Sequence, residues 1–385
     1  MIFKNNDPKT TLSIQYFLHF SVMGVFLPYF NLYCYHLNYS EFQIGLLSAV
    51  RALSMVFFSV IWGLIADRLI TRKASYIICT ITSTFIWSAL TFTVDYNFVL
   101  PTIFIYSIFY GPIIAFLETY ALDILNSSGE NKSGYGNIRV WGSISFILMS
   151  VIIGSVLQQV SINIIIIIIL LTSAGQAFHS FKLPTSRLLK YNFNISTFKN
   201  FFSLKTCFFL LATFLMLLSH GTYYGFFSIH LEKNGFSAAF IGVAWGLASL
   251  SEIIVMLKSE TIFKRFSINS TLIFSFIITC IRWVILYFTK NLYLILLSQI
   301  LHAITYGTFH IACILYIDKL TSKETKTFGQ IVNNATSYGL GMMCGFIING
   351  LFFKQYGEKL FIFSSITALT GCTVLLISFR IKANR

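Results

Sequence analysis

Twelve long apolar stretches, separated by mostly short polar segments, constrain the fold of this chain more than any other feature. A helix needs about 20 apolar residues to cross the hydrocarbon core of a bilayer, and its backbone groups must be hydrogen-bonded internally. Charged residues make up 10% of the 385 residues, compared with about 25% in a soluble domain, and the alternation typical of membrane β-strands is absent. We therefore predict an all-α membrane protein with twelve transmembrane helices at 11–35, 42–66, 74–94, 99–124, 136–160, 162–183, 206–231, 238–259, 268–289, 292–317, 328–353 and 358–380.

The basic residues orient these spans. Of the 27 Lys and Arg residues, 21 lie on one side of the predicted bilayer, four lie on the other, and Arg51 and Arg282 lie inside spans. Loops rich in Lys and Arg stay in the cytoplasm, so we expect both termini to be cytoplasmic and the protein to lie in the cytoplasmic (inner) membrane. The net charge of +14 then reflects topology, and no nucleic-acid partner is expected.

One polar connection is long, and it divides the chain. We predict an N-terminal six-helix bundle at 1–183, a cytoplasmic central loop at 184–205 and a C-terminal six-helix bundle at 206–385. The halves also repeat in sequence. Gly24, Tyr29, Phe30, Ser40, Ile44 and Gly45 are followed 197 residues later by Gly221, Phe226, Phe227, Ser237, Ile241 and Gly242. Parallel repeats of this kind are found in secondary transporters, which bind substrate near the bilayer midplane.

The seven cysteines lie in apolar stretches and form no C-x-x-C pair. We interpret them as small buried hydrophobes. No metal or organic cofactor is expected, and the proton is the coupling ion. The apolar stretch after Lys4 and Lys9 runs to about Tyr35, which is too long for the core of a signal peptide, so we predict a retained first helix.

The polar segment after the second span contains Gly63, Asp67, Arg68, Arg72 and Lys73. Gly63 permits a close helix approach, Asp67 can cap or pair at a neighbouring helix end, and the basic residues anchor the cytoplasmic face. The segment resembles the major facilitator loop motif G-x-x-x-D-R-x-G-R-R/K, with one extra residue and without the second Gly. We assign these five residues to a gating motif, with a solvated basic loop as the alternative.

Further segments resemble the phenylpropionate permease branch of the major facilitator superfamily, which is similar to the lactose permease and nucleoside:proton symporter families. They follow in order along the chain at 135–143, 220–226, 248–252, 281–283 and 299–302, with His310 beyond. The resemblance implies the major facilitator fold, in which two pseudo-symmetric six-helix bundles rock around a central substrate site. It does not name the substrate, because a fold does not determine a function.

Two ionisable residues in the first half are candidates for substrate binding. Glu118 lies about two turns from the cytoplasmic end of the fourth span, and Arg139 lies about one turn into the fifth, so their depths are similar. Charges inside spans are costly and usually functional. In the similar lactose permease, an acid and an Arg on these two helices bind substrate. A fixed ion pair between helices is the alternative, and Asp123 is interpreted as interfacial.

In the second half we predict a proton-coupling site. Glu252 lies roughly 21 Å from the outer end of its helix, where a carboxyl can bind and release a proton. His220, His302 and His310 occupy a similar depth band, and histidine titrates near neutral pH. For each single histidine, a packing role is the alternative.

The remaining candidates for substrate binding are Arg51, Arg282, Tyr223 and Tyr224. A buried arginine facing a cavity favours a substrate that carries a carboxylate or forms hydrogen bonds. Snorkelling of the arginines to the extracellular interface is the alternative. The two tyrosines can stack on a ring of the substrate.

The leading hypothesis is proton-coupled uptake of a small organic solute by alternating access, with aromatic acids, nucleosides and sugars all open. Efflux of amphipathic compounds and a membrane sensor with a transporter fold are the alternatives. No clustered nucleophile and base or metal motif indicates an enzyme. We expect the protein to function as a monomer in lipid and to bind a small molecule.

Overall fold

The computed structural model describes residues 7–127, 133–184, 201–321 and 325–381, which contain helices and no strands. Each of the twelve predicted spans coincides with helix in this part of the chain. Among these residues, ten helices are long and apolar enough to cross a membrane, and Ile164–Ser180 is a shorter apolar helix. The last of the ten, Phe328–Arg380, is turned at Gly357–Lys359. The predicted all-helical membrane fold is therefore confirmed.

The helices of the first half begin and end at clear local signals. They are α1 (Pro8–His36), α2 (Glu41–Arg68), α3 (Arg72–Ser88) with the 3-10 turn η1 (Ala89–Thr91), α4 (Tyr96–Tyr110), α5 (Pro112–Ser127), α6 (Ser133–Val156) and α7 (Ile164–Ser180). The side chains of Asp7, Thr71 and Asp95 accept backbone N–H groups and so cap α1, α3 and α4. The fourth span is interrupted at Pro112, which lacks a backbone N–H and is favoured in the first turn of a helix.

The second half contains two π-helical segments. Its elements are α8 (Leu204–Ser219), α9 (Gly221–Lys233), α10 (Ala238–Arg265), α11 (Ile268–Phe288), α12 (Leu292–Ile300), η3 (Ala303–Thr308), α13 (Phe309–Leu320), α14 (Lys326–Asn334), η4 (Ala335–Gly341), α15 (Met342–Tyr356), η5 (Gly357–Lys359) and α16 (Leu360–Arg380). The segments η3 and η4 are π-helical. Such segments interrupt α-helices and occur frequently at functional sites.

The chain forms two compact units. Unit 1 comprises residues 1–39, 54–191 and 236–246, and unit 2 comprises residues 40–53, 192–235 and 247–385. The beginning of α2 therefore belongs to unit 2, and the beginning of α10 belongs to unit 1. The predicted central loop at 184–205 falls largely on residues 185–200, which lie outside the described residues, so that boundary stays a prediction.

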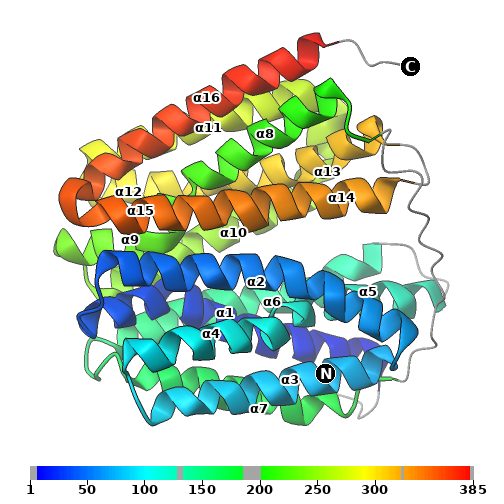
Figure 1. Cartoon of the computed structure of the whole chain (residues 1–385), viewed down its shortest axis with the longest axis vertical. Coiled ribbons are helices and arrows are strands. Elements are labelled where there is room, and N and C mark those ends of the chain that lie inside the picture. Colours follow the sequence, from blue (N-terminus) through cyan, green and yellow to red (C-terminus); the bar gives the residue numbers. More distant parts are fainter. Residues whose placement is uncertain (1–6, 128–132, 185–200, 322–324, 382–385) are drawn as a thin grey trace. The chain divides into compact units, whose positions relative to one another are not determined.

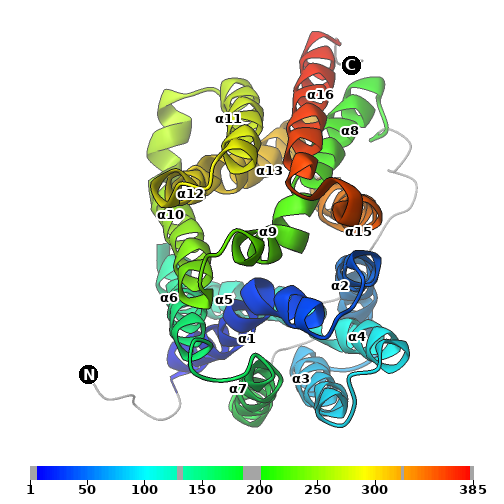
Figure 2. The ribbon, with the colours of Figure 1, turned by 90° about the vertical axis from the view of Figure 1, so that its left-hand side faces the viewer.

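In unit 1, α1 packs against α6 and α7 (Figure 2). Three polar side chains also join this helix to its neighbours. The Tyr76 hydroxyl donates to Gln15 Oε1 (2.7 Å), Gln176 Nε2 donates to the Tyr76 hydroxyl (3.0 Å), and Gln15 Nε2 donates to the Gln176 carbonyl (3.2 Å). A satisfied buried network of this kind holds α1, α3 and α7 in one arrangement.

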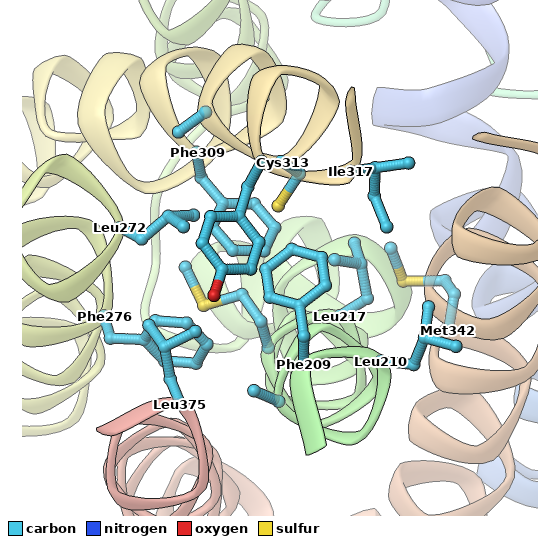
Figure 3. Packing of buried hydrophobic residues seen from close by; sticks show 14 of the residues in the cluster. Phe209, Leu210, Leu217, Leu272, Phe276, Phe309, Cys313, Ile317, Met342 and Leu375 are labelled. Atoms are coloured by element: carbon cyan, nitrogen blue, oxygen red, sulfur yellow. The ribbon is translucent and has the colours of Figure 1, made fainter. Parts of the chain in front are cut away.

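In unit 2, α16 lies beside α8 and α11 (Figure 1). Apolar side chains fill the space between these helices and α13, including Phe209, Leu272, Phe276, Cys313 and Leu375 (Figure 3). Helix association in lipid comes largely from van der Waals packing and interhelical hydrogen bonds. This apolar packing therefore holds in place the helices that carry the polar groups described next.

Candidate functional site

A Glu–His–Arg cluster is buried in unit 2. Arg282 of α11 is completely buried, and its Nη1 donates to Nδ1 of His302, which lies between α12 and η3, at 2.8 Å. Nε2 of the same histidine lies 2.7 Å from Oε1 of Glu252 on α10. Three of the predicted residues therefore meet, and His302 stands between the cation and the acid.

These contacts determine which nitrogen of His302 carries the proton. A guanidinium N–H can only donate, so Nδ1 accepts and the ring proton lies on Nε2. Nε2–H then donates to a carboxyl oxygen of Glu252. The Tyr224 hydroxyl lies 3.3 Å from the same nitrogen. His302 is therefore a neutral imidazole that joins Arg282 to Glu252 by hydrogen bonds.

Arg282 is held by further groups within unit 2. Its guanidinium also donates to Thr305 Oγ1 (3.2 Å) and Gln299 Oε1 (3.4 Å). Its Cζ lies 4.2 Å from the Tyr223 ring centroid and 4.8 Å from that of Trp283, which are cation–π distances. The Tyr223 hydroxyl donates to Gln299 Oε1 at 2.8 Å. Arg282 is thus enclosed and does not snorkel to the surface of the unit.

The other two predicted histidines lie in different environments. His220 Nδ1 is 2.8 Å from the Met216 carbonyl oxygen, and its ring meets Trp283 edge-on. His310 Nδ1 is 2.8 Å from the Tyr338 hydroxyl of η4. The ring of Tyr306 in η3 stacks between His302 and His310, with centroid distances of 5.3 and 6.2 Å. Both π-helical segments therefore contribute aromatic residues to this cluster.

Unit 1 holds a second group of polar residues, around Arg139 of α6. Its Cζ lies 4.1 Å from the Phe20 ring centroid and 5.7 Å from that of Tyr16, both on α1. Nη1 of Arg139 is buried without a hydrogen-bond acceptor. His19, which is 3% exposed, stacks on Tyr110 at 5.0 Å and has no hydrogen-bond partner at Nδ1. Buried donors and acceptors without a hydrogen-bond partner are rare in folded proteins, and a bound ligand can supply the missing partner.

Glu118 and Arg139, for which the sequence predicts similar depths, interact electrostatically. The ion pairs within 4.0 Å among the described residues do not include this pair. Glu118 is exposed on α5, whereas Arg139 is half-buried against the rings of α1. The two charged side chains are therefore close to each other but do not form a direct ion pair.

The predicted gating motif lies in unit 1, where α2 ends and α3 begins. Arg72 is 8% exposed, and its guanidinium pairs with Asp123 of α5 (2.6 Å) and with Asp67 (3.5 Å). Asp67 thus pairs at a neighbouring helix end, as predicted, and Asp123 is an ion-pair partner as well as interfacial. Arg68 ends α2, and Lys73 follows Arg72 in α3.

The surroundings of Gly63 contradict its predicted role, and those of Arg51 do not distinguish between the roles considered for it. A Cβ atom on Gly63 would meet no atom within 4 Å, so the expected close helix approach at this glycine is wrong for this structure. The helix there faces open space. Arg51 is half-buried in the part of α2 that belongs to unit 2.

Close helix contacts occur at other glycines. In unit 2, a Cβ on Gly45 of α2 would lie 2.6 Å from the Phe346 carbonyl oxygen and 2.8 Å from Cα of Gly350 on α15. In unit 1, Gly154 of α6 and Gly242 of α10 are packed as tightly against backbone oxygens. Gly45 and Gly242 are counterparts in the sequence repeat, so each half of the chain makes an equivalent contact.

Sequence reasoning missed several residues of these clusters. His19 met the same criterion as the three predicted histidines, since it lies inside an apolar span. Thr305, Tyr306 and Tyr338 carried no comparable signal, because hydroxyl side chains are common in apolar helices. The described residues contain no group of three His, Cys, Asp or Glu side chains that could hold a metal ion.

Comparison with known proteins identifies the family of this chain. Residues 9–364 match the MFS_1 like family. The probable 3-phenylpropionic acid transporter of Escherichia coli is 24% identical over 380 residues, covering 93% of this chain and 94% of the relative. Nucleoside permease NupG of Escherichia coli is 22% identical over 374 residues, covering 91% and 89%. The crystal structure of nucleoside transporter NupG matches with a TM-score of 0.86 at 19% identity, covering 98% of this chain and 100% of that one.

These matches confirm the resemblance drawn from the sequence segments and the major facilitator fold. The relatives are transporters throughout, which agrees with the ten apolar helices. The chain therefore belongs to the MFS_1 like family and is a multi-pass membrane transporter of a small molecule, not an enzyme.

Proposed function

We propose that this chain is a proton-coupled symporter that takes up a small organic solute by alternating access, with Glu252 binding the proton. The observation that carries the proposal is the arrangement of Glu252, His302 and Arg282, with contacts of 2.7 and 2.8 Å. An acid inside a membrane span is costly and is usually retained for function. The acid can be ionised, in which case it accepts a charge-assisted hydrogen bond from His302, or protonated, in which case it accepts only a weaker one.

Protonation of Glu252 changes the packing forces in unit 2. A neutral carboxyl loses the charge that attracts Nε2–H of His302, and Nδ1 of His302 is occupied by Arg282, so the ring cannot reverse its polarity. A hydrogen bond to a charged group contributes about 1.5–3 kcal/mol. This is enough to change the ratio of two conformations about tenfold or more, so proton binding can bias α10 between two states.

The solute site is proposed to include Arg139, Glu118 and His19 of unit 1. Arg139 and His19 keep buried nitrogens without partners, and Glu118 supplies an acceptor nearby. Aromatic rings of α1 line the same region. A small solute with a planar ring and polar groups suits this set, and relatives are named for 3-phenylpropionic acid, nucleosides and maltose. We also propose a role in substrate binding for four residues of unit 2, Tyr223, Tyr224, Arg282 and Arg51.

We propose the cytoplasmic membrane as the location, with both termini inside, and a functional monomer. The Asp67–Arg72–Asp123 cluster then stabilises the cytoplasmic ends of α2, α3 and α5. Inward movement of one proton gains about 2.3 kcal/mol per 100 mV of membrane potential, which is the driving force for accumulation. No other coupling ion or cofactor is required.

The test is uptake of radiolabelled aromatic acids, nucleosides and sugars into proteoliposomes, with and without an imposed pH gradient. Accumulation of at least one solute should require the gradient. Glu252→Gln should abolish accumulation at a temperature at which this variant, although less stable because Arg282 has lost its counter-charge, is still folded. Glu260→Gln is the matched control, since Glu260 lies on the same helix but is exposed and paired with Lys264. Uptake indifferent to the gradient would refute the proposal, as would normal accumulation by Glu252→Gln.

A further inference from the structure

The three predicted histidines of unit 2, His220, His302 and His310, differ in their capacity to take a second proton. His302 cannot take one while Arg282 donates to its Nδ1, because two donors would then face each other. His220 uses Nδ1–H to donate to the Met216 carbonyl oxygen, and its Nε2 is buried without a partner. A proton on that nitrogen would be a buried charged donor with no acceptor, which is costly.

His310 is different in this respect. Its Nδ1 faces the Tyr338 hydroxyl at 2.8 Å, and a hydroxyl both donates and accepts. Neutral and protonated His310 therefore keep the same hydrogen bond. The charge of Glu252 acts on both His310 and Tyr338, and Tyr306 hydrogen-bonds to Tyr338. His310 is thus the member of the trio whose surroundings accept either charge state.

We propose that His310, with Tyr338, relays the proton from Glu252 toward the cytoplasm during each transport cycle. The inference rests on the proposed function and extends it to the release step. His310 lies eight residues beyond His302, about 12 Å along a helix, in the direction of Lys319 and the basic end of α13. The relay therefore points from the buried acid toward the side on which the proton must leave.

The relay conserves charge and atoms at each step. The O–H bond of protonated Glu252 breaks as a bridging water molecule takes its proton and gives one of its own to Nε2 of His310. The carboxylate then restores its contact with His302 Nε2–H, which returns α10 to its starting contact. The imidazolium of His310 gives its Nδ1 proton to the Tyr338 hydroxyl, whose own proton passes to a water molecule on the cytoplasmic side. His310 is neutral again at the end.

The test compares net uptake with exchange in proteoliposomes. Net uptake driven by a pH gradient needs proton release in every cycle, whereas exchange of labelled for unlabelled solute does not. His310→Gln should slow net uptake at least about tenfold and leave exchange within about twofold. Tyr338→Phe, which keeps the ring and removes the hydroxyl, should act in the same direction and raise the effect of D2O on net uptake. His230→Gln, a buried histidine of α9 outside the cluster, is the control.

The outcomes separate this inference from the proposed function. If wild-type uptake is coupled to protons and His310→Gln transports at the wild-type rate, the relay is wrong while symport stands. Loss of exchange together with net uptake in His310→Gln and Tyr338→Phe would also overturn it, because the residues would then serve binding or folding. If wild-type uptake ignores the pH gradient, the proposed function fails and the relay falls with it.

Discussion

Replacement of Arg282 by Leu should destabilise the protein far more than replacement of Arg282 and Glu252 together. The guanidinium is completely buried and compensates the charge of Glu252 through His302. Removing one partner of a buried ion pair costs about 3–5 kcal/mol, whereas replacing the whole pair by neutral groups is often nearly neutral. The double variant Arg282→Leu, Glu252→Gln removes both charges and leaves no uncompensated ion.

The magnitude follows from the contacts that are lost. Arg282→Leu removes hydrogen bonds to His302, Thr305 and Gln299, each worth about 0.5–3 kcal/mol, and two cation–π contacts worth about 0.5–2 kcal/mol each. These losses occur in both the single and the double variant. The difference between them isolates the charge, and for residues in one network a coupling of about 2 kcal/mol is expected.

The assay is the free energy of unfolding from SDS titration in mixed micelles, measured at about pH 8, where an unconstrained imidazole is neutral. The single variants Arg282→Leu and Glu252→Gln complete the cycle. A coupling below about 0.5 kcal/mol would refute the view that Arg282 compensates Glu252 through His302. A double variant that is less stable than Arg282→Leu would refute it as well.

Three further predictions concern unit 1 and the helix contacts. Gly45→Trp should abolish turnover in protein that still folds, because a Cβ atom added at this position would lie 2.6 Å from the Phe346 carbonyl oxygen and the indole would hold α2 away from α15. Gly63→Trp, in open space, should transport normally. Arg72→Gln should reduce the rate of uptake about tenfold by removing the ion pairs that join α3 to α5, whereas Lys73→Gln should change it less than twofold. Arg139→Lys should raise the KM of uptake at least about tenfold, because a point charge cannot reproduce a planar stacked guanidinium, and an unchanged KM would contradict the proposed solute site.

The sequence predicted the helices well because the physics that selects them is local. A span of about 20 apolar residues has no alternative to a helix in lipid, and all twelve predicted spans are helical in the described residues. The pairing of Asp67 also follows from local charge, since Arg72 is only five residues away. Helix interruptions were harder to predict. The break at Pro112 has a recognisable cause, but the π-helical η3 and η4 depend on packing that a single span does not reveal.

The sequence predicted how deep each candidate residue lies along its span, but not the direction in which each helix turns its side chains. Depth follows from counting residues along a span, and it predicted a similar level for Glu252 and His302, which lie in contact, but it did not predict the contact of Arg282 with His302. Which side chains touch depends on how each helix is turned and what packs against it. Glu118 and Arg139 share a level without a direct ion pair, because the guanidinium of Arg139 lies on the ring of Phe20 instead. Hydrogen-bond direction, which separates His310 from the other histidines, needs atomic positions.

The repeat shows how two similar halves can divide one task. Gly45 and Gly242 occupy equivalent positions 197 residues apart, and each packs tightly against backbone. The same offset from Glu252 leads to Met55, a side chain that cannot bind a proton. The repeat therefore duplicates the helix contacts but not the titratable acid. If proton binding and solute binding are assigned to different halves, exchanging Glu252 and Met55 should abolish coupled accumulation even though the composition of the chain is unchanged. Accumulation that survives this exchange would show that the proton site does not depend on His302 and Arg282.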